Sequence, residues 1–234
     1  SPSAPITITV NPTPAVATNV RATPTSVCDS GASTLSATAG ANGTTVRWYS
    51  ATTGGELLHT GLTFTPTVTA TTTYYAVSFN ATTGCESSTR VGATVNVNPT
   101  PATPTITNLT AGRTYYTGER YNGNYFLTLT GSAPPAGGTA SFSGPGVSLV
   151  GGAYQFSPCN ALPAGQNEGA VTITYTVRSA GGCERSTSTT INVRRSTYTV
   201  VLQTSPFPVC PGTNTNYTAR VLRDAVVTFP DPAN

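Results

Sequence analysis

The chain has 234 residues, only 8% of them charged, and a formal net charge of +3 at pH 7. The basic residues are scattered, apart from the pair Arg194-Arg195. A nucleic-acid-binding surface needs clustered Lys and Arg, and a membrane helix needs roughly 18 consecutive apolar residues. The sequence has neither, so we expect no nucleic-acid partner and no membrane insertion in this segment.

The composition favours β-strands over α-helices. Thr, Val and Tyr are common, Met and Lys are absent, and the chain contains 23 Gly and 19 Pro. β-Branched and aromatic residues favour strands, and many short strands joined by Gly and Pro turns indicate sandwiches or barrels. The length suits about two domains.

Strands are predicted wherever apolar and polar residues alternate with a period of two. The clearest segments are 46–49, 74–79, 91–97 and 171–178. Each has one apolar face and one polar face, commonly rich in Thr, as in an antiparallel sheet with one face on a core and one in water. Trp48 is the only Trp, and on a central strand it is expected to be a core residue; the alternative is a platform for sugar stacking. In the segment 74–79 we expect Tyr75, Val77 and Phe79 to face the core and Tyr74 to be partly exposed.

Repeated motifs indicate domain boundaries. Residues 6–15 (ITITVNPTPA) and 93–102 (ATVNVNPTPA) both read as a final strand that runs into a Pro-rich linker. We therefore expect tandem antiparallel β-sandwiches joined by Pro-rich linkers. The expected boundaries are 1–14 for the last strand and linker of a preceding module, 15–101 and 102–195 for two complete modules, and 196–234 for the start of a third. No signal peptide precedes the first strand, so this organisation predicts a window within a longer array.

Two of the five cysteines lie in turns before an early strand, and two in turns before a final strand. Cys28 and Cys85 are 57 positions apart, and we expect them to form a disulfide worth roughly 4 kcal/mol in the chain-entropy model. A Cys159–Cys183 disulfide would be worth roughly 3 kcal/mol, and Cys210 is left without a partner. One disulfide per domain suits secreted sandwiches; the alternative is that all five are buried free thiols.

Residues suited to catalysis are scarce. The chain has one His and eight acidic residues, without a nucleophile elbow, a carboxylate pair or a calcium-binding D-x-D motif. His59 reads as a surface residue. We therefore predict no catalytic residue, no metal site and no cofactor.

One segment, residues 112–126 (GRTYYTGERYNGNYF), suggests a binding patch. Tyr and Arg are the residue types that commonly form binding hot spots, and Tyr rings also stack on sugars. The alternative is a hairpin whose Tyr side chains pack across strands. The residues of the possible patch are Arg113, Tyr115, Tyr116, Arg120, Tyr121 and Tyr125.

The order of motifs in the first module resembles a known family. The segments VCDSGASTLSATAG, VRWYSATTGGELLHTG, TATTTYYAVSFNATTGCESS and VNVNPTP resemble the Ig-like repeats of giant surface proteins in Bacteroidota. The second module, through SFSGPGV, YQFSP, ITYTV, GGC and STSTTINV, resembles the PKD-like repeats of the same proteins, although Cys159 and the Tyr/Arg segment depart from that pattern.

This resemblance implies an extracellular array attached to the bacterial cell surface, exported by the type IX system, in a protein of adhesion or gliding motility. Its expected partners are other modules of the same chain or fibre, surface glycans or other cells. The resulting hypothesis is a structural and adhesive repeat region that is not an enzyme. One alternative is a spacer or carbohydrate-binding region of a secreted multidomain enzyme. Another is a filament subunit in which the strand Ile6–Val10 completes the module 196–234 of a neighbour.

Overall fold

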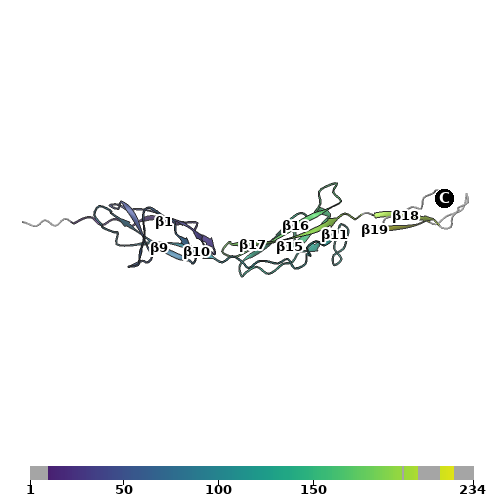
Figure 1. The fold of residues 1–234 in the computed structure, drawn as a ribbon, viewed down its shortest axis with the longest axis horizontal. Coiled ribbons are helices and arrows are strands. Elements are labelled where there is room, and N and C mark those ends of the chain that lie inside the picture. Colours follow the sequence, from purple (N-terminus) through teal and green to yellow (C-terminus); the bar gives the residue numbers. More distant parts are fainter. Residues whose placement is uncertain (1–9, 197, 205–216, 224–234) are drawn as a thin grey trace, which may run out of the picture. The chain divides into compact units, whose positions relative to one another are not determined.

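The computed structural model describes residues 10–196, 198–204 and 217–223 (Figure 1). Regular structure in this part of the chain consists of β-strands and one 3-10 helix, η1 (Pro158–Asn160). The predicted all-β class is therefore confirmed. The chain divides into two compact units, which we describe separately. Unit 1 is Ser1–Ala102 with Pro134–Thr139 and Val177–Arg185, and unit 2 is Thr103–Ala133, Ala140–Thr176 and Ser186–Asn234.

Unit 1 contains a three-stranded sheet, a five-stranded sheet and a short additional pair of strands. The three-stranded sheet has the order β1-β4-β7, with β1 at Thr18–Thr23, β4 at Thr34–Thr38 and β7 at Thr63–Phe64. The five-stranded sheet has the order β2-β10-β9-β5-β6, with β2 at Ser26–Cys28, β10 at Val91–Asn98, β9 at Thr72–Phe79, β5 at Thr45–Tyr49 and β6 at Leu57–Thr60. The additional pair is β3 (Gly31–Ala32) and β8 (Thr67–Val68).

Trp48 lies in the core of unit 1, as the sequence predicts. It is fully buried among residues of both larger sheets, including Leu35 and Val95. Its indole Nε1 donates a hydrogen bond of 3.0 Å to the carbonyl oxygen of Gly61. The central position of β5, between β9 and β6, explains this burial, because side chains on one face of a central strand are covered by the opposing sheet.

The prediction for β9 is wrong about which tyrosine faces the core. Tyr74 is 8% exposed and belongs to the core cluster, whereas Tyr75 is only half-buried. The reason is register: Trp48 pairs directly with Ala76, and cross-strand partners share a face, so the even-numbered residues of β9 face the Trp48 side. Val77 and Phe79 are buried as predicted, but on the other face, where the guanidinium of Arg47 lies 3.4 Å from the centre of the Phe79 ring.

Unit 2 contains most of one four-stranded sheet, together with one three-stranded sheet and a hairpin. The four-stranded sheet has the order β11-β17-β16-β13, with β11 at Thr114–Tyr116, β17 at Glu184–Arg194, β16 at Glu168–Arg178 and β13 at Thr139–Ser143. The three-stranded sheet has the order β12-β15-β14, with β12 at Leu127–Thr128, β15 at Ala153–Phe156 and β14 at Val147–Val150. The hairpin joins β18 (Tyr198–Thr204) to β19 (Tyr217–Arg223).

The alternation predicted for residues 171–178 is confirmed in β16. Val171, Ile173 and Tyr175 are buried, and the intervening Thr side chains point away from the core. These side chains form a ladder of cross-strand hydrogen bonds with β17, at 2.8–2.9 Å between hydroxyl oxygens: Thr172 with Thr190, Thr174 with Ser188, and Thr176 with Ser186. The Thr-rich face therefore stabilises the pairing of the two longest strands through its own hydroxyl groups.

The predicted disulfide pairing is wrong: Cys28 is bonded to Cys183, and Cys85 and Cys159 are free. Cys28 ends β2, which runs parallel to β10 and pairs there with Asn98, the last residue of β10. Cys85 precedes the start of β10, so the two cysteines lie at opposite ends of an eight-residue strand, roughly 25 Å long. Disulfide formation requires Cα atoms within about 7 Å of each other.

The same argument separates Cys159 from Cys183. Cys159 lies in η1, which packs against β11, and β11 pairs with the Asn192–Arg194 end of β17. Cys183 immediately precedes Glu184, at the other end of this 11-residue strand. Cys183 is instead 1% exposed within unit 1, next to Asn98, whose side-chain amide donates a hydrogen bond of 3.1 Å to the carbonyl oxygen of Gly181.

Candidate functional site

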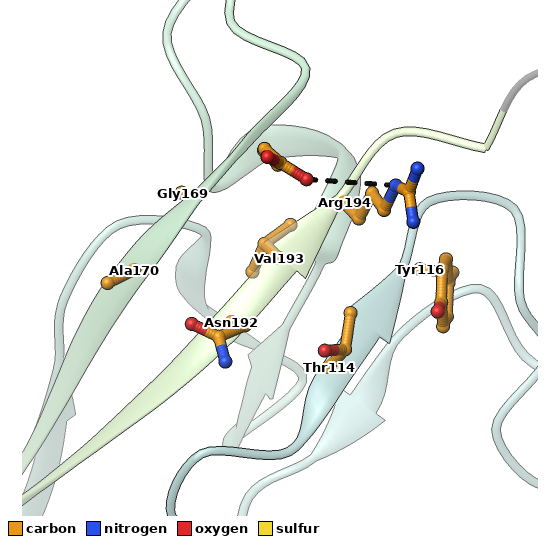
Figure 2. Close-up of a pocket in the computed structure, with 8 residues that line it drawn as sticks. Thr114, Tyr116, Gly169, Ala170, Asn192, Val193 and Arg194 are labelled. Atoms are coloured by element: carbon orange, nitrogen blue, oxygen red, sulfur yellow. Dashed lines mark ion pairs between the residues drawn. The ribbon is translucent and has the colours of Figure 1, made fainter.

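A groove of about 370 Å³ lies on the outer face of the four-stranded sheet of unit 2 (Figure 2). Tyr115, Ile191 and Val193 of the same strands have their side chains buried in the core, so the residues that alternate with them face outward. The groove residues are Thr114, Tyr116, Glu168, Gly169, Ala170, Asn192, Val193 and Arg194.

Parallel pairing of β11 with β17 brings the groove side chains together. Thr114 pairs with Asn192, and Tyr116 pairs with Arg194. Because directly paired residues share a face of the sheet, a hydroxyl, an amide, an aromatic ring and a guanidinium project from the same side. Figure 2 shows these side chains on two adjacent strands. Glu168, the first residue of β16, forms an ion pair with Arg194.

The groove offers hydrogen-bonding groups with little net charge. Arg194 Nε lies 3.8 Å from Glu168 Oε2, and both side chains are more than half exposed, so solvent screens this ion pair strongly. Asn192 Nδ2 donates a hydrogen bond of 3.0 Å to the carbonyl oxygen of Gly112, which fixes the amide and leaves its oxygen as an acceptor. Such a surface suits a neutral ligand rich in hydroxyl groups.

The structure divides the predicted Tyr/Arg patch into a buried part and an exposed part. Tyr115 is 1% exposed and is therefore a core residue rather than a surface contact. Its ring packs edge-on against Phe156, with 6.0 Å between centroids, and also contacts Tyr121. The guanidinium of exposed Arg113 lies 4.9 Å from the centre of the Tyr115 ring. The alternative interpretation, Tyr side chains packing together, therefore applies to this part.

The exposed part of the patch surrounds a tight turn. Asn122 and Gly123 both have positive φ (49° and 86°), as in the type I′ turn that Asn-Gly favours. Arg120 Nη2 donates a hydrogen bond of 3.2 Å to the hydroxyl of Tyr125, which is 54% exposed. The Arg120–Tyr125 pair and Tyr116, which lines the groove, are the members of the predicted patch best placed for binding.

Tyr121 supports this turn from the half-buried side. Its hydroxyl donates a hydrogen bond of 2.9 Å to Glu119 Oε2. Burial raises the pKa of the Tyr121 phenol well above its ordinary value, and the nearby Glu119 carboxylate raises it further. The phenol therefore stays neutral at physiological pH, and this bond positions Tyr121 rather than providing an acid or a base.

Of the eight groove residues, the sequence predicted only Tyr116, and the polar residues Thr114, Glu168, Asn192 and Arg194 were not predicted. Alternation along TTINVRR identifies Asn192 and Arg194 as outward-facing residues, but it does not show what lies beside them. The parallel pairing with a three-residue strand about 80 positions earlier has no local sequence signal.

The other titratable clusters support structure. Arg47 Nη1 lies 3.0 Å from Glu86 Oε1, which also accepts a hydrogen bond of 2.6 Å from the Tyr49 hydroxyl. His59 is exposed, as predicted, and stacks on Phe64. Within the described residues, no group of three or more His, Cys, Asp or Glu side chains is placed to hold a metal ion, and no helix is long and apolar enough to cross a membrane.

Residues 14–99 match the family model described as "Ig-like domain CHU_C associated". This match supports the predicted resemblance of the first module to the Ig-like repeats of Bacteroidota surface proteins. Modules of this kind are generally not catalytic. Together with the disulfide, they indicate an extracellular protein.

Similar solved structures include the fibronectin(III)-like modules of CbhA from Clostridium thermocellum, with 18% identity, a TM-score of 0.41, and coverage of 78% of this chain and 93% of that one. Murine CEACAM1b has 12% identity, a TM-score of 0.37, and coverage of 76% of this chain and 99% of the CEACAM1b chain. The immunoglobulin domains 1–5 of Sidekick-1 have 16% identity, a TM-score of 0.38, and coverage of 82% of this chain and 40% of the Sidekick-1 chain. Similarity at this level concerns the fold alone. No curated protein matches the chain.

Proposed function

We propose that this chain is part of the structural and adhesive repeat region of a long secreted fibre or adhesin at the surface of a bacterial cell. The observation that carries the proposal is the family match of residues 14–99, an Ig-like module type of Bacteroidota surface proteins. Two further observations support it. Unit 2 has buried apolar residues of its own, including Phe156 and Ile173, and the described residues contain no cluster suited to metal catalysis.

Labelling of intact source cells tests this proposal. Antibodies raised against the 234-residue chain are expected to label unpermeabilised cells, and external protease is expected to remove the label. A denaturing gel of the released protein gives the length of the native polypeptide, which we expect to be several hundred kilodaltons. Labelling only after permeabilisation would contradict the proposal.

Adhesion needs a separate measurement. Beads coated with the chain are expected to bind to the partner surface or to other cells more strongly than beads coated with denatured chain. Export by the type IX system predicts loss of the surface label when that system is deleted in the source cells. Gliding motility predicts loss of cell movement when the gene is deleted, whereas a passive stalk predicts normal movement.

The groove of unit 2 favours a second function, binding of carbohydrate within a secreted multidomain enzyme. Thr114, Asn192 and Arg194 offer hydrogen-bonding groups beside the Tyr116 ring, which is the combination that sugar hydroxyls and sugar faces require. Affinity electrophoresis through gels containing soluble polysaccharides tests this function. Asn192→Ala is expected to abolish retardation, whereas Thr174→Ala, on the hydroxyl ladder of the same sheet, is expected to leave it unchanged.

Assembly by strand exchange remains a hypothesis. The donor strand Ile6–Val10 lies outside the described residues except for Val10, and most of the acceptor segment 196–234 also lies outside them. The light-scattering mass of the chain at rising concentration tests it, because donor exchange predicts growing oligomers.

A further inference from the structure

The Cys28–Cys183 disulfide closes a covalent ring in which the two cysteines are 155 positions apart. The ring contains every strand from β3 to β16, including β5 with Trp48. β1 and β2 lead into the ring at Cys28, and β17 leaves it just after Cys183. About two thirds of the chain is therefore enclosed between two covalently joined points.

We propose that this disulfide is a mechanical bypass that protects the enclosed chain from tension. Tension applied to the two flanking segments passes from Cys28 directly to Cys183 through the sulfur–sulfur bond, because a covalent bond does not yield under forces that separate strands. Residues 29–182 then lie outside the covalent path of the tension. This inference rests on the proposed function, since a surface fibre is a structure that is pulled from both ends.

The local structure holds both ends of the bypass in place. Cys28 lies on β2, which pairs with β10 over three residues. The backbone N–H of the next residue, Asp29, donates a hydrogen bond of 2.9 Å to the carbonyl oxygen of Asn98. Cys183 is 1% exposed, and its backbone N–H lies 3.2 Å from the hydroxyl oxygen of Ser179.

The bypass limits how far the chain extends rather than whether it unfolds. The flanking strands are themselves part of the fold: β1 pairs with β4, and β17 supplies the buried residues Ile191 and Val193. Tension on the flanks therefore still pulls on β1 and β17. Even when they detach, the enclosed residues add no length to the extended chain. An extended chain spans at most about 3.3–3.6 Å per residue. The intact disulfide therefore prevents roughly 510–560 Å of chain from adding to the end-to-end distance, and we call this the hidden length.

Single-molecule pulling of the full 234-residue chain measures this hidden length. Handles are attached at the two ends through peptide tags without cysteine, and the oxidised chain is stretched before and after treatment with a phosphine that reduces disulfides. We expect complete unfolding of the reduced chain to yield roughly 510–560 Å more length than unfolding of the oxidised chain. The Cys28→Ser/Cys183→Ser variant is expected to give the longer length without reduction.

The free cysteines provide the controls. Cys85→Ser and Cys159→Ser are expected to behave like the wild type. A hidden length of only roughly 190–205 Å, which a Cys28–Cys85 bond would give, would overturn the inference, as would equal lengths before and after reduction. If the double variant does not fold, the comparison between the oxidised and the reduced wild-type chain still tests the inference.

The pulling experiment and the cell-surface experiment test the bypass and the proposed function separately. A hidden length of the expected size in a chain that is absent from the cell surface would overturn the fibre proposal and leave the covalent bypass intact. A chain that is displayed on cells and mediates adhesion, but shows no hidden length, would overturn the bypass alone.

Discussion

Trp48 on β5 pairs directly with Ala76 on β9, and this pairing decides which tyrosine of β9 enters the core of unit 1. Tyr74 lies on the same side as Ala76, is 8% exposed, and packs edge-on against Phe64 at 5.6 Å. Tyr75 faces the other side and is only half-buried.

Replacing each tyrosine with alanine tests this register. Tyr74→Ala removes a buried ring and is expected to lower the free energy of unfolding of the first module by about 3 kcal/mol or more. Tyr75→Ala is expected to cost about 1 kcal/mol, because less apolar surface leaves the protein interior. Urea unfolding followed by Trp48 fluorescence measures both, and a larger loss for Tyr75→Ala would contradict the register.

Gly131 lies against the ring of Tyr175. A Cβ atom at this position would lie 2.5 Å from Tyr175 Cε1, which is too close for two carbon atoms. The ring has little room to move, because it stacks on Phe142 at 4.3 Å and donates its hydroxyl hydrogen to the Ser132 carbonyl oxygen. Gly131→Ala is therefore expected to lower the free energy of unfolding of unit 2 by about 1–3 kcal/mol, measured by thermal unfolding followed by circular dichroism.

The control for this substitution is Gly92→Ala on β10. The nearest atom to its added Cβ is a methyl group of Thr73 at 3.2 Å, and that side chain is free to adjust by a few tenths of an ångström. We expect a change within about 0.5 kcal/mol. Equal effects at the two glycines would contradict the proposed contact between Gly131 and Tyr175.

The Tyr121–Glu119 hydrogen bond predicts a pH dependence. The pKa of the folded-state phenol is raised above its unfolded value of about 10, first by burial and then by Glu119. The stabilisation that this neutral phenol contributes is therefore complete below pH 10 and is lost as the pH rises through the higher folded-state pKa. Glu119→Gln removes the negative charge, so the pKa of Tyr121 is expected to fall while burial keeps it above the ordinary value.

NMR titration of tyrosines labelled with ¹³C at Cζ measures this shift. Glu56→Gln removes a carboxylate that does not contribute to the Tyr121 pKa shift and is expected to leave the Tyr121 titration unchanged. An unchanged pKa in Glu119→Gln would show that the carboxylate does not act on the phenol.

Loss of the Cys28–Cys183 disulfide is expected to destabilise the chain by up to about 5 kcal/mol in the chain-entropy model, because the closed loop is long. Reducing agent should lower the Tm of the wild type but not that of Cys28→Ser/Cys183→Ser. Digestion without reduction is expected to yield one peptide pair that joins Cys28 to Cys183. A linked pair containing Cys85 or Cys159 instead would contradict the structure.

Sequence periodicity predicted much of the fold correctly. Alternation identified the inward faces of β5, β10 and β16, and it placed Trp48 and Val46 in a core. These predictions succeed because burial of one sheet face is a local pattern, in which every second residue is apolar. The same pattern did not resolve β9, because both of its faces are buried over Val77, Ser78 and Phe79 and no polar face marks the outside.

The candidate site was predictable only in part. Composition correctly identified the segment 112–126 as rich in Tyr and Arg, and Tyr116 and Arg120 remain accessible there. The burial of Tyr115 depends on its contact with Phe156, which lies far away in the sequence. The groove itself joins residues 114–116 to residues 168–170 and 192–194, and no local pattern reports such a juxtaposition.

The sequence by itself determined the all-β class, the Ig-like character of the first module and most of the residues that face the cores, because these follow from the composition and alternation of neighbouring residues. The tertiary structure alone decided which cysteines are bonded and where the groove lies. Both depend on parallel pairing: β2 pairs with the end of β10, and β11 pairs with the end of β17. The partners of such a pair are far apart in the chain, and only the register of the folded sheets brings them together.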